Sequence, residues 1–204
     1  MNLFDLAIIG GGPAGMSAAL VAGRARLRTL VVNAEQPRNA VTTASHGFLT
    51  RDGAHPDELL AVAKAQLSKY PSVRYVQGKV EEVSPAPEGF ALRIPGGPPV
   101  RAQRVILATG YKDDLAGLAL PGLDEVYGTS VFPCPFCDGF EHADERLALF
   151  GSQGIEHFAP VVRIWSEDIV VFTNGVPLDE PPKAQLEQRG IRVVEASVSR
   201  LLSE

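Results

Sequence analysis

Short apolar runs alternate with glycine-rich turns and helix-compatible segments along the first part of the chain. An apolar run at residues 3–9 is followed by a glycine turn, a helix-compatible segment from residue 16 to about residue 25, and a second apolar run at 28–33. Apolar runs of this length, bounded by turn residues, predict buried strands. The order strand, turn, helix, strand therefore predicts a βαβ unit with parallel strands.

The same pattern continues to residue 122. A helix is predicted over about residues 55–69, because its leucine and alanine side chains recur on one face. The strands predicted after it are residues 73–77, three short antiparallel strands at 79–84, 90–94 and 100–101, and a buried strand at 104–108. Residues 113–122 end on Pro121-Gly122 and predict a linker. We therefore expect a first domain at residues 1–114 and a second at 115–204.

The second domain repeats the first in outline. Its predicted strands are residues 146–150, 168–172, 191–194 and 198–202, and its predicted helices run to about residue 165, with a kink or break at Pro160, and over 182–190. The predicted fold class is α/β: a Rossmann-like domain, with a parallel sheet and a small antiparallel β-meander, and then a nucleotide-binding-like α/β domain.

The first glycine turn has the G-x-G-x-x-G spacing of dinucleotide-binding units. Gly10 permits the tight turn, Gly12 lets the backbone approach a pyrophosphate, and Gly15 lets the helix pack on the strand. The N–H groups of the following helix start would then face phosphate. Asn33 stands where an acidic residue usually binds the ribose, and Glu35 follows two residues later. The alternative is a glycine turn in an ordinary βαβ unit.

Composition and charge exclude several classes of partner. The 204 residues are 45% hydrophobic and 21% charged, with a net charge of −5 and no basic cluster, which argues against nucleic acid or an anionic membrane as the main partner. No apolar run approaches the ~20 residues that span a bilayer, and the N-terminus lacks the features of a signal peptide. We therefore expect a cytoplasmic, reducing setting.

The only two cysteines, Cys134 and Cys137, form a Cys-x-x-Cys motif. In a reducing compartment such a pair predicts redox chemistry first and metal binding second, because two close thiols can form and reopen one disulfide ring. The adjacent Asp138 is an acid that protonates a leaving thiolate, a helix cap, or both. A zinc module that adds His142 and His157 is the metal-binding alternative, although it lacks a second close ligand pair.

Three motifs lie in order along the chain: Gly10-Gly11-Gly12-Pro13-Ala14-Gly15, Ala108-Thr109-Gly110 and Cys134-Pro135-Phe136-Cys137-Asp138-Gly139. Together they resemble the pyridine nucleotide-disulfide oxidoreductases of the low-molecular-weight thioredoxin reductase type. The stretch His46-Gly47-Phe48-Leu49-Thr50-Arg51-Asp52-Gly53 is similar to a branch that includes dithiol oxidases of secondary metabolism. The resemblance extends from residue 3 to the end of the chain.

This resemblance implies an enzyme with FAD in its first domain, a dithiol or disulfide substrate, and a homodimer. It implies that Cys137 faces the flavin, that Cys134 exchanges with the substrate, and that Asp138 is the acid–base. The cofactor-binding residues expected on these grounds are Gly10, Gly12, Pro13, Ala14, Gly15, Asn33, Glu35, Arg38, Asn39, His46, Val80, Thr109 and Gly110, and no metal ligand is expected.

Two departures from the family pattern leave alternatives open. The turn Gly151-Ser152-Gln153-Gly154 carries Gln153 in place of the middle glycine, and no basic cluster follows for a 2′-phosphate, so NADP(H) is weakly supported. The chain also stops inside the second unit, so we expect a C-terminal truncation and an incomplete second domain. The alternatives are an oxygen-dependent dithiol oxidase that does not use NADPH and a truncated, non-catalytic flavin-binding remnant.

Overall fold

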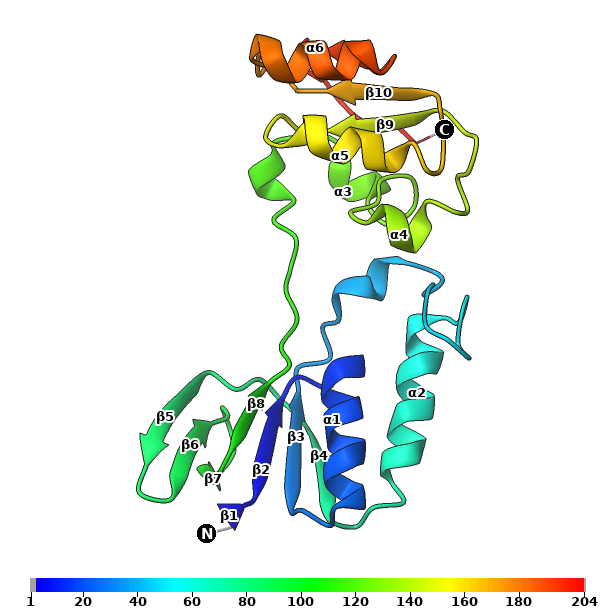
Figure 1. Cartoon of the computed structure of the whole chain (residues 1–204). Coiled ribbons are helices and arrows are strands. Elements are labelled where there is room, and N and C mark those ends of the chain that lie inside the picture. Colours follow the sequence, from blue (N-terminus) through cyan, green and yellow to red (C-terminus); the bar gives the residue numbers. More distant parts are fainter. Residues whose placement is uncertain (1–2, 204) are drawn as a thin grey trace. The chain divides into compact units, whose positions relative to one another are not determined.

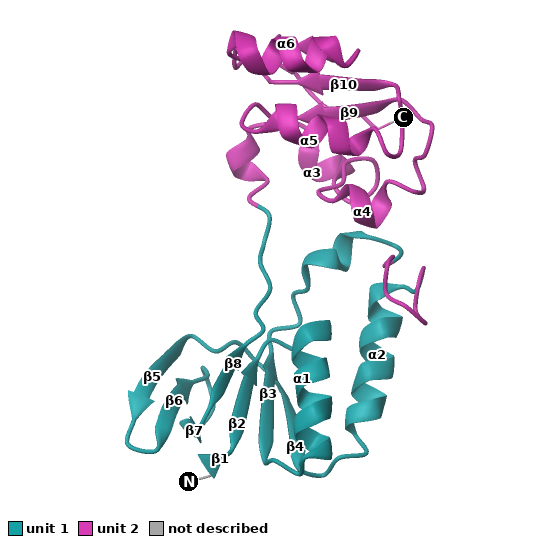
Figure 2. Ribbon diagram, in the orientation of Figure 1, with its two compact units in different colours: residues 1–44, 54–113 teal, residues 45–53, 114–204 magenta. Residues whose placement is uncertain are grey.

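A computed structural model describes residues 3–203 of the chain. They form two compact units: residues up to 44 together with 54–113, and residues 45–53 together with those from 114 onward (Figure 2). The grouping of 45–53 with the second unit was not predicted. The functional domains at 1–114 and 115–204 stay predictions, and residues 1, 2 and 204 lie outside the described chain.

The first unit is built on a parallel sheet with the strand order β4-β3-β2-β8. Helices α1 and α2 lie together on one side of this sheet (Figure 1). The elements are β2 (Leu6–Ile9), α1 (Pro13–Arg24), β3 (Thr29–Asn33), η1 (Arg38–Val41), α2 (Pro56–Leu67), β4 (Val73–Gln77) and β8 (Val105–Leu107). This arrangement confirms the predicted α/β fold with its parallel sheet.

Strand β2 is buried on both faces and places two clusters of apolar side chains back to back. Leu6 and Ile8 pack with Met16 of α1, while Ala7 and Ile9 pack with side chains of a second, smaller sheet. Successive side chains of a strand point to opposite faces, so a strand covered on both sides needs a continuous apolar run. The same strand ends at the glycine turn, which therefore starts from a rigid base.

The smaller sheet contains the predicted meander. Its order is β1-β7-β6-β5, with β5 (Glu82–Ala86), β6 (Gly89–Arg93), β7 (Val100–Ala102) and β1 (Leu3–Phe4). The meander strands are antiparallel, as predicted, but β5 begins at Glu82 rather than at residue 79. The apolar run at 3–9 is also not one strand, because β1 leaves the large sheet and pairs in parallel with β7.

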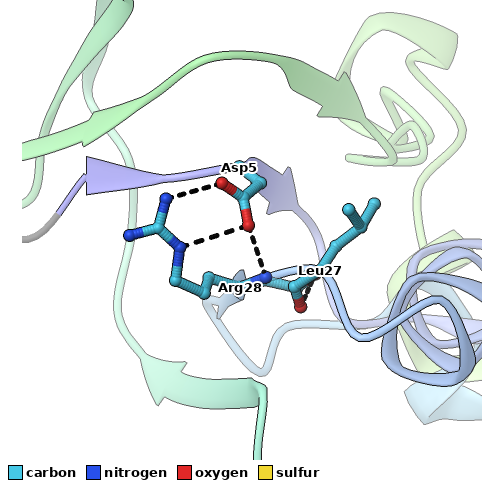
Figure 3. Close-up of polar contacts among 4 residues, drawn as sticks. Asp5, Leu27 and Arg28 are labelled. Atoms are coloured by element: carbon cyan, nitrogen blue, oxygen red, sulfur yellow. Dashed lines mark hydrogen bonds and ion pairs between the residues drawn. The ribbon is translucent and has the colours of Figure 1, made fainter.

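Asp5 causes this break. Its carboxylate accepts hydrogen bonds from the backbone N–H of Arg28, at 2.8 Å, and from the guanidinium, with Nη2 at 2.7 Å from Oδ1 (Figure 3). The Asp5 N–H in turn donates to the Arg28 carbonyl at 2.9 Å. Hydrogen bonding to Arg28 lowers the pKa of Asp5. The interaction fixes the start of β3 against the junction of β1 and β2.

The second unit contains a parallel sheet of order β11-β10-β9. Its elements are η2 (Ala116–Leu118), α3 (Leu123–Val126), α4 (Pro135–Asp138), β9 (Leu147–Phe150), α5 (Ile155–Val162), β10 (Ile169–Phe172), α6 (Glu180–Gln188) and β11 (Arg192–Val194). Buried side chains of α5, α6 and β10 form its core, and Pro160 lies inside α5, which ends before residue 165. Along the described chain, no helix combines the length and the apolar character needed to cross a bilayer.

The strand predicted at residues 198–202 is wrong, since this stretch has no regular structure. Its backbone N–H groups bond outside any strand ladder. Val198 donates to the Asn174 side chain at 2.9 Å, and Leu201 donates to the Pro121 carbonyl at 2.8 Å. The apolar residues of this segment therefore belong to an irregular stretch that is hydrogen-bonded to the rest of the second unit, and not to a strand.

We predict that Asp5→Asn lowers the free energy of unfolding at pH 7, because an amide cannot form the ion pair with Arg28. The pKa of Asp5 is lowered in the folded state, so the stability it contributes is present above the pKa of the unfolded chain and is lost as the pH falls. The difference in the free energy of unfolding between Asp5→Asn and the parent chain should thus shrink below about pH 4. Urea unfolding at several pH values measures it. Asp179→Asn, at an exposed helix cap without a side-chain hydrogen bond, is the control; a gap independent of pH would contradict the prediction.

Candidate functional site

Two glycines of the first turn allow close backbone approach. Gly10 has a φ of +109°, and a Cβ there would lie 2.1 Å from the Ala108 carbonyl oxygen. A Cβ on Gly15 would lie 1.9 Å from the carbonyl oxygen of Gly10. Neither position has space for a side chain, which agrees with the roles predicted for the tight turn and for helix packing.

Gly12 is different, because nothing lies within 4 Å of the position its Cβ would take. It is the N-cap of α1, makes no side-chain cap, and is followed by Pro13 with no acidic residue in the first turn. The first N–H groups of a helix lack intrahelical partners and attract anions. The turn therefore fits the pyrophosphate of a dinucleotide, with Gly12, Ala14 and Gly15 offering backbone.

Asn33 holds this turn in place. Its Oδ1 accepts a hydrogen bond from the Gly11 N–H at 3.2 Å, and its Nδ2 donates to the Tyr75 hydroxyl at 2.6 Å. The side-chain amide thus uses both of its ends within the unit, which explains an amide at a position where an acid is usual. Glu35 accepts from Lys64 Nζ at 2.9 Å. The ribose-binding role of both residues stays a prediction.

Arg38 was expected near the flavin, and the structure gives it a protein partner. Its guanidinium forms two hydrogen bonds with Asp113, Nε–Oδ2 at 2.6 Å and Nη2–Oδ1 at 2.9 Å, and lies 4.5 Å from the centre of the Tyr111 ring. Such a bidentate pair fixes geometry. It ties η1, where Asn39 also lies, to the segment that follows β8.

The other expected cofactor residues of this unit lie at the ends of strands. Thr109 and Gly110 follow β8, both are exposed, and Gly110 has a φ of +64°. Val80 packs against the cluster that contains Ala7 and Ile9. Ligands of parallel α/β sheets bind beyond the carboxyl ends of the strands, which is where Thr109 and Gly110 stand.

The Cys-x-x-Cys motif forms the short helix α4, with Cys134 as its N-cap. The Cys137 thiol donates a hydrogen bond to the Cys134 sulfur, and the two Sγ atoms lie 2.9 Å apart. A disulfide bond is about 2.05 Å long, so closing the ring requires only a small movement. Cys134 is half-buried and Cys137 is exposed. The motif therefore presents a preformed dithiol.

Asp138 is the last residue of α4, so it is not the N-terminal cap that one interpretation of the sequence allowed. Burial raises its pKa, and the charge of Glu141 raises it further, while His46 and His142 lower it. A carboxyl group with a raised pKa, on the residue that follows Cys137 in the chain, can hold and release a proton closer to neutral pH. This position suits an acid–base.

Aromatic side chains flank the motif. The Phe136 ring meets the Trp165 ring edge-on, with centroids 5.0 Å apart, and a Cβ on Gly139 would lie 2.9 Å from Trp165 Cδ2. The glycine of the motif thus makes room for the tryptophan. No local pattern predicts this contact, because Trp165 follows α5 and is distant from the motif along the chain.

The turn of the second unit fits a dinucleotide poorly. Gln153 is exposed at the position of the middle glycine, and Glu156 lies in the first turn of α5 with its side chain 16% exposed. A carboxylate at a helix N-terminus already interacts with the positive end of the helix, which disfavours a phosphate there. Gly154 alone keeps the open geometry of such a turn, with nothing near its Cβ position.

The geometry of the described residues does not support the zinc alternative. Across the part of the chain that the structure describes, no three His, Cys, Asp or Glu side chains are grouped so that they could hold a metal ion. His142 is engaged with Glu145 at 2.9 Å, and His157 lies 3.5 Å from Glu156.

The comparisons with known proteins agree with these features. The family model described as pyridine nucleotide-disulphide oxidoreductase matches residues 4–171. The chain belongs to this family of oxidoreductase enzymes. Members of the thioredoxin reductase-like group depend on FAD and use NADPH. The family resemblance and the α/β fold expected from the sequence are thereby confirmed.

Particular relatives support the same group. The chain is 35% identical over 181 residues to an Arthroderma benhamiae protein named a probable thioredoxin reductase, covering 84% of this chain and 44% of that protein. It is 33% identical to thioredoxin reductase tcpT of Claviceps purpurea, with 85% and 56% covered. A solved oxidoreductase from Agrobacterium tumefaciens superposes with a TM-score of 0.91 at 38% identity, covering 99% of this chain and 68% of that one. The chain thus spans about half the length of these curated relatives.

We predict that Gly12→Ala and Gly15→Ala separate cofactor binding from folding. An added Cβ at Gly15 collides with backbone, so it should cost roughly 1–3 kcal/mol or more in the free energy of unfolding. At Gly12 the Cβ enters open space, so stability should change by no more than about 1 kcal/mol, while FAD affinity falls at least about tenfold because the pyrophosphate loses its approach to the backbone. Urea unfolding and fluorescence titration with FAD measure both; Gly12→Ala binding FAD like the parent chain would contradict the prediction.

Proposed function

We propose that the chain is an FAD-linked thiol–disulfide oxidoreductase of the thioredoxin reductase-like group, in which Cys134 and Cys137 exchange electrons with a dithiol or disulfide substrate. The observation that carries the proposal is the pair of sulfur atoms 2.9 Å apart, followed in the chain by Asp138, whose pKa is raised. Family membership and the pyrophosphate-type turn supply the flavin part of the proposal.

The exchange can be written in either direction. In dithiol oxidation, a substrate thiolate attacks the Cys134 sulfur of the Cys134–Cys137 disulfide, and Cys137 leaves as a thiolate. The second substrate thiolate attacks the substrate sulfur of the mixed disulfide and releases Cys134. The substrate becomes a disulfide and the cysteine pair gains two electrons. Disulfide reduction is the reverse sequence.

Asp138 moves the protons of this exchange. Each step releases a thiolate, and a nearby carboxylic acid that is still protonated can donate its proton to that leaving group. The same carboxylate can take a proton from an attacking thiol in the opposite direction. The raised pKa places this group closer to neutral pH than an ordinary aspartate, which suits both roles.

The first unit would hold the cofactor. Gly10, Gly12, Pro13, Ala14 and Gly15 would bind the pyrophosphate, and the remaining predicted contacts with the adenosine, ribityl chain and ring are Asn33, Glu35, Arg38, Asn39, His46, Val80, Thr109 and Gly110. When bound, the flavin supplies the two-electron carrier that oxidises or reduces the cysteine pair. Assembly as a homodimer stays a prediction from the resemblance.

We favour dithiol oxidation with oxygen as the final acceptor of two electrons and two protons. The supporting observation is the second-unit turn, where Gln153 and the carboxylate of Glu156 disfavour a pyrophosphate. Disulfide reduction driven by NADPH is the second candidate, because thioredoxin reductase-like relatives use NADPH.

The test is anaerobic stopped-flow absorbance of the full chain loaded with FAD. We expect dithiothreitol to bleach the flavin band near 450 nm, and NADPH at the same concentration to bleach it at least about tenfold more slowly because its site is poor. Cys134→Ser and Cys137→Ser should each abolish rapid bleaching by the dithiol while keeping bound FAD.

The other outcomes are equally informative. Faster bleaching by NADPH would overturn the oxidase direction. Bound flavin that neither reductant bleaches would identify a non-catalytic remnant, and a chain that binds no FAD would overturn the proposed function itself.

A further inference from the structure

Residues 45–53 form a closed loop that belongs to the second unit, although the chain on both sides of it belongs to the first. The Gly53 N–H donates to the Ser45 carbonyl at 3.0 Å. The Gly47 N–H donates to Asp52 Oδ1 at 2.8 Å. These bonds close the loop around His46, whose side chain is 24% exposed. The position of this histidine is therefore set by its own loop.

His46 stands between two carboxylates. Its Nδ1 lies 3.6 Å from Asp52 Oδ1, and its Nε2 lies 3.6 Å from Glu141 Oε1. Both distances are within ion-pair range but too long for hydrogen bonds. Asp52 comes from the same loop, whereas Glu141 follows the redox helix α4. The ring thus connects segment 45–53 to the cysteine motif through charge.

The arrangement bears directly on Asp138. The charged groups that act on Asp138 are Glu141, His46 and His142, and His142 is itself paired with Glu145 at 2.9 Å. Glu141 makes it harder for Asp138 to lose its proton, because a second negative charge nearby is unfavourable. A positive charge on His46 offsets that effect. Histidine is also the side chain that changes its charge between about pH 5 and 8.

We propose that His46 is a positioning residue for Asp138: held between Asp52 and Glu141, its ring in the protonated form offsets the charge of Glu141 and thereby governs when Asp138 gives up its proton. The proposal deepens the proposed function, since it rests on Asp138 serving as the acid–base of thiol exchange. It gives His46 a role at the cysteine pair in addition to the contact with the flavin that the family resemblance implies.

The charge of the His46 ring changes how strongly Asp138 holds its proton. When the His46 ring is neutral, only the charge of His142 opposes the effect of Glu141 on the pKa of Asp138, so Asp138 retains its proton more strongly. When the ring is positively charged, it favours the Asp138 carboxylate. Asp52 lies on the far side of the ring from Glu141, with its Oδ1 3.6 Å from His46 Nδ1.

The experiment follows the carboxyl carbon of Asp138 by NMR in the reduced full chain labelled with ¹³Cγ-aspartate, with the resonance assigned from its loss in Asp138→Asn. We expect the titration midpoint of Asp138 to move upward in His46→Gln and downward in Glu141→Gln. His46→Lys, which keeps a cation, should restore a midpoint at or below that of the parent chain. His157→Gln removes an exposed histidine of the same unit and should leave the midpoint unchanged.

An Asp138 midpoint in folded His46→Gln equal to that of the parent chain would overturn the proposal. If His46→Gln fails to fold, Glu141→Gln decides. An unchanged Asp138 midpoint in Glu141→Gln would show that Glu141 exerts no charge effect for His46 to offset, and would overturn the proposal. These readouts need neither flavin nor turnover. Shifted midpoints in a chain that oxidises no dithiol would support the role of His46 and overturn only the proposed function.

Discussion

Two sulfur atoms held 2.9 Å apart at the start of one short helix are the constraint from which the functional account follows. Helix α4 sets this distance, since its N-cap and third helical residue are the two cysteines. The helix is held by packing of Phe136 and Gly139 against Trp165. A pair placed in this way can close and open a disulfide with little movement of the backbone, and chemistry that passes two electrons depends on that ease.

The first unit is organised to present a backbone rather than side chains. Strand β2 is packed on both faces, the glycine turn follows it, and Gly10 and Gly15 leave no room for a Cβ. The result is a rigid turn with one open position, at Gly12, in front of the start of α1. The amide of Asn33 keeps the turn in place. Phosphate recognition at this turn therefore depends on the close packing of Gly10 and Gly15. In the second unit, Gln153 interrupts the same glycine spacing.

Local pattern predicted most of the fold, because buried strands and glycine turns have strong signatures over a few residues. Strand β4 matches its predicted range, and the Cys-x-x-Cys motif predicted the paired thiols. The failures have non-local causes. Asp5 breaks an apolar run through hydrogen bonds to Arg28, residues 198–202 are held by Asn174 and Pro121 rather than by a strand, and the approach of His46 to Glu141 joins segments far apart along the chain.

The central claim, that Cys134 and Cys137 form one reversible redox pair, is tested most directly by equilibrating the full chain with glutathione buffers of graded potential and measuring intact mass after thiol alkylation. The account predicts that both thiols disappear together in a single reversible transition, without a glutathione adduct at equilibrium, because an intramolecular partner outcompetes glutathione. Two thiols that react independently, each gaining glutathione, would contradict it.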